Sequence, residues 1–253
     1  MTPSGLPYRV RHQLRIVQAA GFDLRPGARI LDLGCGEGAT VSALRDAGYD
    51  AVGAETVLRD SVAARDRFDE GLVRQIDLTP YRLPFEDGEF DLILSSEVLE
   101  HVMDYEDLVR ESHRVQKPGG MSMHIFPGRW MPVEGHLFVP LATVHRSYPW
   151  LLLWARLGVR NQYQRGEHYR DVARFNYTWL REQTNYPTTA TVRRLFERRF
   201  ATVEFREDLF LTHTESSRGR AVHRAVRAAP VLLGVYRTLW NRVLVARREN
   251  ARP

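Results

Sequence analysis

The segment 30–38, ILDLGCGEG, places one acidic side chain before three glycines that alternate with other residues. A dinucleotide-binding loop also has three glycines, but its third glycine falls one residue later, where this chain has Ala39. The carboxylate of Asp32 would repel a pyrophosphate and would pair well with an ammonium group. Because glycine has no Cβ, the loop lets a ligand approach the backbone closely. The segment therefore predicts a binding loop for a positively charged ligand.

Two further carboxylates follow apolar runs that are typical of strands. Glu55 ends the run 51–54, and Asp77 follows the run 72–76. A carboxylate offers two acceptor oxygens, so Glu55 is suited to hold both hydroxyls of a ribose. Asp77 is suited to accept from the amino group of an adenine. These residues predict a ligand with a cation, a ribose and an adenine but no phosphate, and S-adenosylmethionine (SAM) has these parts.

A second cluster of chemical interest is Glu97-Val98-Leu99-Glu100-His101. We expect a helix over 97–102, in which Glu97 and His101 are four residues apart and Glu100 lies in the same turn. Two carboxylates and one imidazole at this spacing can hold a divalent metal, Mg²⁺ or another. The alternative is that the cluster is structural, with His101 packed on the sheet.

Further motifs follow the loop and Glu55 in order: Asp77-Leu78, then 83–85 (LPF) with Phe90-Asp91, then 117–120 (KPGG). This order resembles the class I, Rossmann-like, SAM-dependent methyltransferases, and the resemblance covers residues 24–127. It implies that SAM is the cofactor, with its methionine end at Asp32, its ribose at Glu55 and its adenine between Asp77 and Leu78. The expected cofactor-binding residues are Asp32, Gly34, Cys35, Gly36, Gly38, Glu55, Asp77, Leu78, Ser96 and Glu97.

The resemblance also bears on the metal. Ubiquinone-pathway O-methyltransferases and small-RNA 2′-O-methyltransferases carry a similar Glu-x-x-Glu-His that binds metal with a later histidine, whereas metal-free relatives carry Glu-His here as well. The later histidine would be His136, or with less support His124. The expected metal ligands are thus Glu97, Glu100, His101 and His136, and the expected catalytic residues are His136 and His101. His145 and His168 are alternative general bases, and a nucleophilic Cys35 is an alternative to a cysteine that packs beside the cofactor.

Strand and helix patterns alternate through the first half of the chain, which predicts an α/β fold with a doubly wound, mostly parallel, seven-stranded sheet. Its strand ends meet at one edge, where ligands bind. The expected strands are 29–33, 51–54, 72–76, 90–95 and 121–126, and the expected helices are 8–20, 39–47, 60–68, 97–102, 105–115 and 191–200.

The alternation stops after residue 127. Segment 129–187 is rich in Trp, Tyr, His and Arg, which predicts an inserted helical and aromatic cap over the acceptor pocket, or a small secondary core. Segments 201–206 and 209–214 are expected to close the sheet as an antiparallel pair. The predicted units are a SAM-binding core (1–128 and 188–215), the cap (129–187) and a basic amphipathic C-terminal helical segment (216–253).

Composition limits the function classes. Apolar residues make up 43% of the 253, which excludes disorder for most of the chain, and one cysteine excludes a disulfide framework. We see no spanning helix or secretory signal, so we expect a cytoplasmic protein. The net charge is −7 up to residue 128 and +12 afterwards, and arginine supplies 35 of 36 basic residues. A GC-rich coding sequence or a selected anionic partner would each explain that bias.

The leading hypothesis for function is O-methylation of a hydroxyl on a sugar, polysaccharide or glycolipid. The alternatives are a quinone-like phenol or other small natural product, then RNA 2′-O-methylation, then a SAM-binding scaffold without catalysis. Small-molecule, glycan or glycolipid acceptors are therefore the expected partners, and nucleic acid is less favoured. The basic C-terminal helix can dock on the domain or make a peripheral contact with an anionic membrane.

Overall fold

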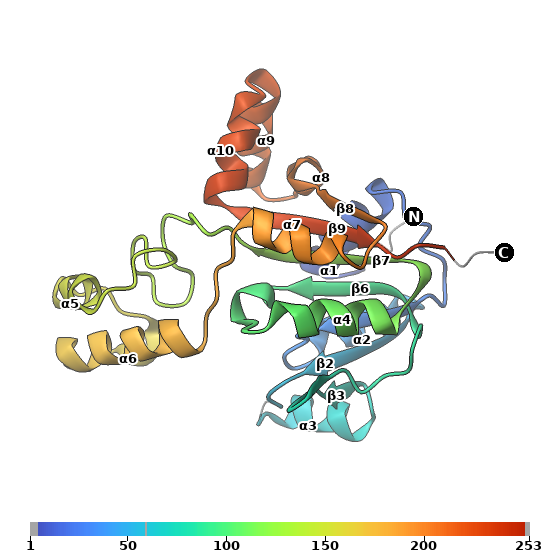
Figure 1. Cartoon of the computed structure of the whole chain (residues 1–253), viewed down its shortest axis with the longest axis horizontal. Coiled ribbons are helices and arrows are strands. Elements are labelled where there is room, and N and C mark those ends of the chain that lie inside the picture. The colour runs from blue at the N-terminus through green and yellow to red at the C-terminus, as the bar shows by residue number, and fades with distance from the viewer. Residues whose placement is uncertain (1–4, 59, 251–253) are drawn as a thin grey trace.

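A seven-stranded sheet forms the centre of the computed structural model, which describes residues 5–58 and 60–250 (Figure 1). Its strands are β1 (Arg29–Leu33), β2 (Asp50–Glu55), β3 (Val73–Gln75), β6 (Phe90–Ser96), β7 (Gln116–Pro127), β8 (Thr202–Phe205) and β9 (Asn241–Arg247). Their spatial order is β3-β2-β1-β6-β7-β9-β8. The first five are parallel, and β9 runs antiparallel to both β7 and β8. The predicted doubly wound, mostly parallel sheet is thus confirmed.

Helices cover both faces of the sheet. One core lies beneath α4 (Tyr105–Val115) and α7 (Thr189–Glu197), and the other beneath α1 (Tyr8–Ala19), α2 (Ala39–Asp46) and α8 (Glu207–Thr212). Side chains along a strand alternate between these cores: Leu31 enters the first and Ile30 the second. Because both faces are covered, central strands such as β6 are almost continuously apolar. Helix α3 (Val62–Asp69) connects β2 and β3. Among the described residues, no helix is long and apolar enough to cross a membrane.

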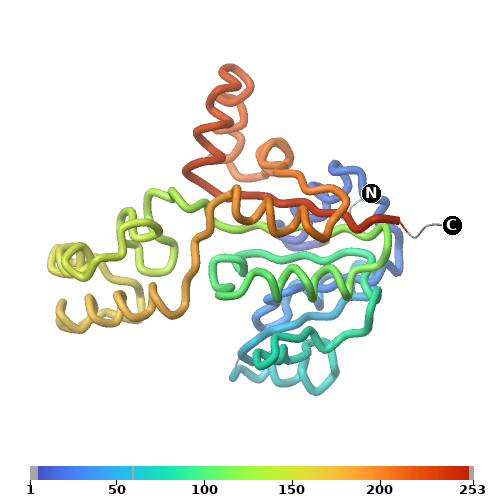
Figure 2. Tube along the Cα trace, viewed as in Figure 1, coloured from blue at the N-terminus to red at the C-terminus, as the bar shows by residue number. Residues whose placement is uncertain are grey.

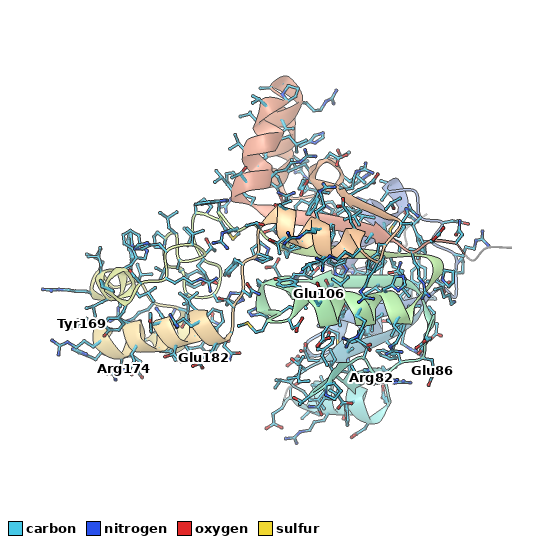
Figure 3. All side chains as sticks on the ribbon, in the orientation of Figure 1. Arg82, Glu86, Glu106, Tyr169, Arg174 and Glu182 are labelled. Carbon is cyan, nitrogen blue, oxygen red and sulfur yellow. The ribbon has the colours of Figure 1, made fainter. Side chains whose placement is uncertain are left out.

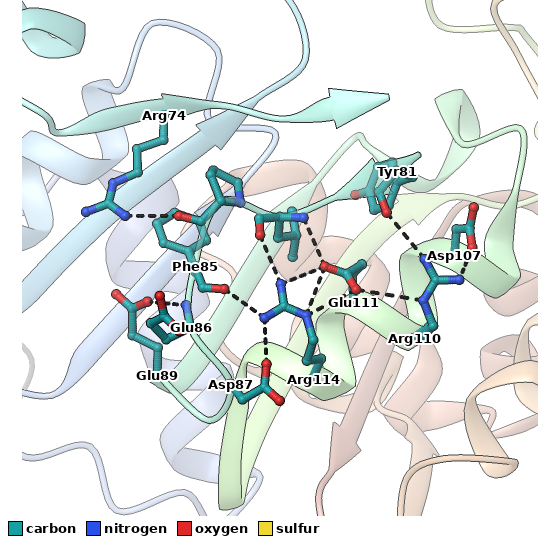
Figure 4. Close-up of polar contacts among 12 residues, drawn as sticks. Arg74, Tyr81, Phe85, Glu86, Asp87, Glu89, Asp107, Arg110, Glu111 and Arg114 are labelled. Atoms are coloured by element: carbon teal, nitrogen blue, oxygen red, sulfur yellow. Dashed lines mark hydrogen bonds and ion pairs between the residues drawn. The ribbon is translucent and has the colours of Figure 1, made fainter. Parts of the chain in front are cut away.

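A short hairpin, β4 (Asp77–Leu78) with β5 (Tyr81–Arg82), follows β3. The chain after it is held on α4 by two charged residues (Figure 4). Arg114 donates to the carbonyl oxygens of Leu83 and Phe85 at 2.9 and 2.7 Å, and Glu111 accepts from the backbone N–H of Leu83 at 3.0 Å. The buried Glu111–Arg114 pair therefore anchors the segment that carries the hairpin.

The insertion, residues 129–187, stands clear of the sheet (Figure 2). It contains α5 (Tyr148–Arg156), a 3₁₀ turn η2 (Gln162–Gln164) and α6 (Tyr169–Glu182). Most of its aromatic side chains pack into two small apolar clusters between these helices, although Trp130, Phe138, Tyr163 and Phe175 remain exposed. Trp150, Trp154, Tyr177 and Trp179 lie against the larger cluster.

Two expectations for the C-terminal part are wrong. Segment 209–214 falls largely in α8 rather than in a strand, and β8 pairs with β9 instead. The C-terminal segment is helical only in α9 (Ser217–Ala228) and α10 (Val231–Leu239), after which β9 lies inside the sheet. The spacing of apolar residues up to Val243 fits a helix, but β9 is buried on both faces and its apolar run is continuous. The last residues of the expected segment, 251–253, lie outside the described part of the chain.

Candidate functional site

The glycine loop lies at the carboxyl end of β1 and leads into α2. Gly34 has a φ of 73°, and a Cβ there would overlap Val98 Cγ2, so only glycine fits without a shift. Its N–H donates to the carbonyl oxygen of Ala54 on β2 at 2.8 Å. At Gly36, by contrast, a Cβ would meet open space, although φ is again positive at 56°. The loop thus touches the segment after β6 on one side and opens to solvent on another.

Glu55 at the end of β2 holds this loop in place. Its Oε2 accepts from the Gly36 N–H at 2.8 Å, and its Oε1 accepts from the Thr56 N–H at 2.8 Å. Oε1 also accepts from Thr56 Oγ1 at 3.2 Å, whereas Oε2 can accept a second hydrogen bond. Glu55 can therefore serve the loop and still accept from a ligand hydroxyl.

Asp32 is only 6% exposed, within β1. Burial raises the pKa of its carboxyl to about 7, against the opposing positive charge of Arg9. Arg9 lies on α1, and the sequence reasoning missed it because its charge reaches this site only through the packing of α1. A buried carboxyl with a raised pKa is the feature that a cationic ligand group would stabilise in its ionised form.

The chain turns sharply after β6. Gln13 of α1, which the sequence reasoning also missed, donates from Nε2 to Ser96 Oγ at 2.7 Å. Glu97 then adopts a left-handed φ of 58°, and only Leu99–His101 form a single 3₁₀ turn, η1. The predicted helix over 97–102 is therefore wrong, and Glu97 and His101 do not share a helical face.

Three of the four expected metal ligands nevertheless meet. One ligand atom from each of Glu100, His101 and His136 lies within 4.8 Å of the others. Glu97 is outside this group because the left-handed turn redirects it, although its charge still acts on Glu100. His124 is also outside, so its expected ligand role is wrong. It is buried on β7 with its Nδ1 2.7 Å from Ser95 Oγ, and burial lowers its pKa to about 3.

Glu100 is the unusual member of the group. Its side chain is buried, and among the described residues neither oxygen accepts from an N–H or hydroxyl group, so the carboxyl of Glu97 is its hydrogen-bonding neighbour. Burial, followed by the negative charge of Glu97, raises the pKa of Glu100 to about 9. A buried carboxyl that accepts from no such group is stable only when it is protonated or bound to a cation.

Both imidazoles are oriented by their Nδ1 atoms. His101 Nδ1 lies 2.7 Å from the carbonyl oxygen of Gln183, and His136 Nδ1 lies 2.9 Å from Glu134 Oε1. A proton on Nδ1 satisfies each contact and leaves Nε2 with a free lone pair. Metal-binding histidines are commonly fixed by a carbonyl or carboxylate in this way. The donor set of one carboxylate and two imidazoles therefore fits a divalent cation.

Glu134 is fully buried and accepts four hydrogen bonds. The donors are His136 Nδ1, Tyr186 Oη at 2.7 Å, and the backbone N–H groups of His136 and Leu137 at 3.0 and 2.7 Å. Burial acts to raise the pKa of Glu134, but these hydrogen bonds outweigh it and lower the pKa. The Glu-x-His spacing was a signal for this pair, whereas nothing in the sequence pointed to Tyr186.

A cavity of about 650 Å³ adjoins the cluster inside the insertion. His136 and Trp179 line it, and their rings are 5.0 Å apart. Three of its other lining side chains, Phe138, Tyr163 and Phe175, are more than half exposed. The cavity thus leads from an aromatic rim towards one of the cluster's imidazoles.

The remaining expected residues lie elsewhere. Asp77 and Leu78 are exposed in β4, and Leu78 presents 60% of its surface. Cys35 packs against Gly53, and burial raises the pKa of its thiol, so a nucleophilic role is not supported. His145 and His168 are exposed, and neither lines the cavity. His168 caps α6 by accepting from the Arg170 N–H.

Known proteins resemble the part of the chain that carries the glycine loop, Glu55, Glu100 and His101, and the match ends before His136. Residues 31–123 match the family described as methyltransferase domain. The chain is 36% identical over 107 residues to an uncharacterized methyltransferase of Mycolicibacterium gilvum, which is 42% of each protein. It is 35% identical over 99 residues to a ubiquinone biosynthesis O-methyltransferase of Roseobacter denitrificans, which is 38% of this chain and 40% of that protein. The chain thus spans less than half the length of these curated relatives.

The fold has a counterpart among solved structures. An S-adenosylmethionine-dependent methyltransferase from Mesorhizobium loti superimposes with a TM-score of 0.52 at 22% identity, over 94% of this chain and 98% of the other. At this identity the likeness concerns the fold. Together with the family match, it shows that residues 31–123 form a methyltransferase domain in a chain that has the fold of this S-adenosylmethionine-dependent methyltransferase.

Proposed function

We propose that the protein is an O-methyltransferase that takes its methyl group from SAM and uses a divalent cation. The observation that carries this proposal is the buried carboxyl of Glu100, which accepts from no N–H or hydroxyl group and meets two oriented imidazoles. A sulfonium methyl group is already a strong electrophile, so the protein must chiefly position the acceptor and remove its proton.

The cofactor site is proposed from the loop and its two acidic side chains. Asp32 would pair with the ammonium of SAM, and Glu55 would accept from the ribose hydroxyls. Leu78 is exposed and apolar, which suits the face of an adenine, and the neighbouring Asp77 offers an acceptor for its amino group. Gly36, where a Cβ would meet open space, leaves the backbone of the loop accessible to the methionine end, whereas Gly34 and Gly38 let the loop pack closely on Val98 and Val73.

The cation would be held by Glu100 and by Nε2 of His101 and His136. When bound, a divalent cation lowers the pKa of a coordinated hydroxyl. Gln183 and Glu134 hold the two imidazoles in the required tautomer. If no cation binds, Nε2 of His136 is the candidate general base, because His136 lines the cavity and its Nδ1 is engaged with Glu134.

For the acceptor we propose a sugar, polysaccharide or glycolipid hydroxyl. The aromatic rim of the cavity suits stacking on a sugar ring, and polar side chains such as Asn161 and Asp171 also line the cavity. A phenolic acceptor is the second candidate. The ubiquinone biosynthesis O-methyltransferases among the relatives favour it, as does stacking on Trp179.

The acceptor can be found by incubating the protein with trideuteriomethyl SAM and fractionated cell extract. We expect the label on a sugar or glycolipid hydroxyl, detected by mass spectrometry. Label on a phenol would favour the second candidate, and label on RNA would overturn the assignment of acceptor. Failure to form S-adenosylhomocysteine (SAH) with every fraction would contradict the proposed enzyme and favour a scaffold.

The affinity for SAH is expected to depend on pH through Asp32. Below pH 7 this carboxyl holds a proton in the free protein, whereas pairing with the ligand ammonium requires the ionised form. Binding should therefore weaken as the pH falls, by about tenfold between pH 8 and pH 6. Titration calorimetry at both pH values measures this. Asp32→Asn should bind SAH weakly at both pH values. Equal SAH affinity of the unmodified protein at pH 8 and pH 6 would contradict the role of Asp32.

Glu134→Gln is expected to weaken cation binding about 10- to 100-fold, the usual effect of removing the partner of a metal-bound histidine. The amide cannot accept all four donors, so His136 loses its fixed tautomer. Binding is measured with Mn²⁺ by electron paramagnetic resonance, and SAH affinity reports whether the fold is intact. Tyr186→Phe removes one donor to Glu134 and keeps the contact between Glu134 and His136. It should therefore lower the affinity for the cation less than Glu134→Gln does. Equal Mn²⁺ affinity for Glu134→Gln and the unmodified protein would refute the positioning role.

A further inference from the structure

The two helices α9 and α10 form a hairpin that projects from the domain (Figure 1). Helix α9 has no buried residue, and α10 buries only Tyr236. Residues 216–240 contain five arginines and no lysine, aspartate or glutamate. The hairpin is thus an exposed basic surface and contributes little to either core of the sheet.

The tip of the hairpin is apolar, with the sequence AAPVLL over residues 228–233. Val231 is 76% exposed, and Leu232 is 37% exposed. A turn between two solvated helices is ordinarily built from polar residues and glycine. Val235, one turn further along α10, is also exposed. The apolar side chains therefore continue from the tip along one helix without a protein partner.

Arginines flank this apolar tip. Arg224 and Arg227 lie in the last two turns of α9, and no acidic side chain pairs with either among the described residues. Arg237, nearer the base of the hairpin, differs because its Nε donates to Glu207 at 3.0 Å. The positive charge at the tip is therefore not neutralised by the protein.

We propose that this hairpin docks on an anionic lipid bilayer, with the apolar tip at the boundary of headgroups and acyl chains and the arginines on lipid phosphates. Exposed aliphatic side chains beside unpaired basic residues are the composition of helices that lie in the membrane interface. The phosphates of a nucleic acid would pair with the arginines, but a nucleic acid would not account for the exposed apolar side chains of Val231 and Leu232. In a symmetric pair of copies the two hairpins would meet, and each is equally basic. The inference does not depend on which acceptor is methylated.

The test is cosedimentation of the whole protein with vesicles of phosphatidylcholine alone or mixed with phosphatidylglycerol. We expect binding to the mixed vesicles only, weakening as salt is raised. Each arginine near an anionic surface contributes roughly a fivefold gain in affinity, so Arg224→Glu with Arg227→Glu should reduce binding at least about 25-fold. Val231→Ser with Leu232→Ser should also reduce binding, since it removes the inserting groups without touching the core.

The matched control is Arg82→Glu with Arg194→Glu. It changes the net charge by the same amount as the arginine variant of the hairpin, but at exposed positions of the core. Figure 3 shows Arg82 far from the hairpin. We expect this variant to bind vesicles like the unmodified protein. Three outcomes would overturn the proposal: no binding to mixed vesicles, equal losses in the control and hairpin variants, or dimerisation or RNA binding through the hairpin without lipid binding. SAH affinity measured on each variant confirms that the fold is intact and keeps this test separate from that of the enzyme.

Discussion

Gly34→Ala is expected to lower the affinity for SAH about 100-fold or more, which corresponds to roughly 2.7 kcal/mol of binding free energy. Alanine at a left-handed φ is strained by about 1–2 kcal/mol, and its Cβ would overlap Val98 Cγ2. Relief of the overlap must move the loop or the segment that leads into η1, and the proposed site uses both. Titration calorimetry with SAH measures the loss.

Two variants make this prediction specific. Gly48→Ala is the matched control, because Gly48 has a φ of 87° but a Cβ there meets open space. It should cost about 1 kcal/mol of stability and leave SAH affinity unchanged. Val98→Ala combined with Gly34→Ala removes the overlapping methyl groups and should recover part of the affinity. If Gly34→Ala binds SAH as tightly as Gly48→Ala does, the loop is not the cofactor site.

Removal of divalent cations with EDTA, or replacement Glu100→Gln, is expected to lower methyl transfer on the order of 10³-fold. Glutamine keeps the volume of Glu100 but supplies no negative charge to hold a cation. Because Glu100 accepts from no N–H or hydroxyl group and a glutamine amide can still donate to Glu97, this change should not destabilise the folded protein. Rates with labelled SAM, before and after Mg²⁺ or Mn²⁺ is restored, measure the effect.

The sequence predicts four metal ligands, and the structure brings three of them together. Measuring the metal bound by variants of single ligands distinguishes the two sets. Glu97→Gln should retain the bound cation, since Glu97 lies outside the cluster, whereas Glu100→Gln should lose it. Mn²⁺ titration by electron paramagnetic resonance detects this independently of catalysis. Full activity in EDTA would show that the reaction needs no divalent cation, and His136 would then remain as the candidate general base.

The positions of the glycine loop and of Glu55 were predictable because their determinants are local, whereas their binding of the cofactor stays a prediction. A left-handed backbone favours glycine, and a carboxylate at the end of a parallel strand faces the edge where loops gather, so Gly34 and Glu55 could be placed from the sequence. The strands before residue 128 are short apolar runs separated by turn residues, which is the most readable pattern of this fold class.

The errors arose where local pattern and tertiary context disagree. Glu97-Val98-Leu99-Glu100-His101 has helical composition, but the chain leaves β6 through a left-handed residue, and composition does not report that turn. Val243-Leu244-Val245 continues the apolar spacing of α10, and a short apolar run cannot be assigned to strand or helix by periodicity alone.

The residues that orient the histidines were beyond prediction for a different reason. Gln183 lies 82 residues from His101, and Tyr186 lies 52 residues from Glu134. Such contacts depend on how the insertion returns to the sheet after α6. A single sequence does not show where the chain runs after α6. Glu134 and His136, by contrast, are two residues apart, so their spacing indicated that they could interact.

The position of β9 between β7 and β8 has a consequence for how the protein is made. A ribosome synthesises β8 well before β9, and within residues 5–58 and 60–250 β8 pairs with no strand except β9. Until residue 247 has emerged, β7 and β8 both present open edges that can recruit strands from other nascent chains. Chaperone capture of ribosome-bound chains should therefore persist until the final strand closes that gap, and a stop codon placed ahead of it should yield insoluble protein.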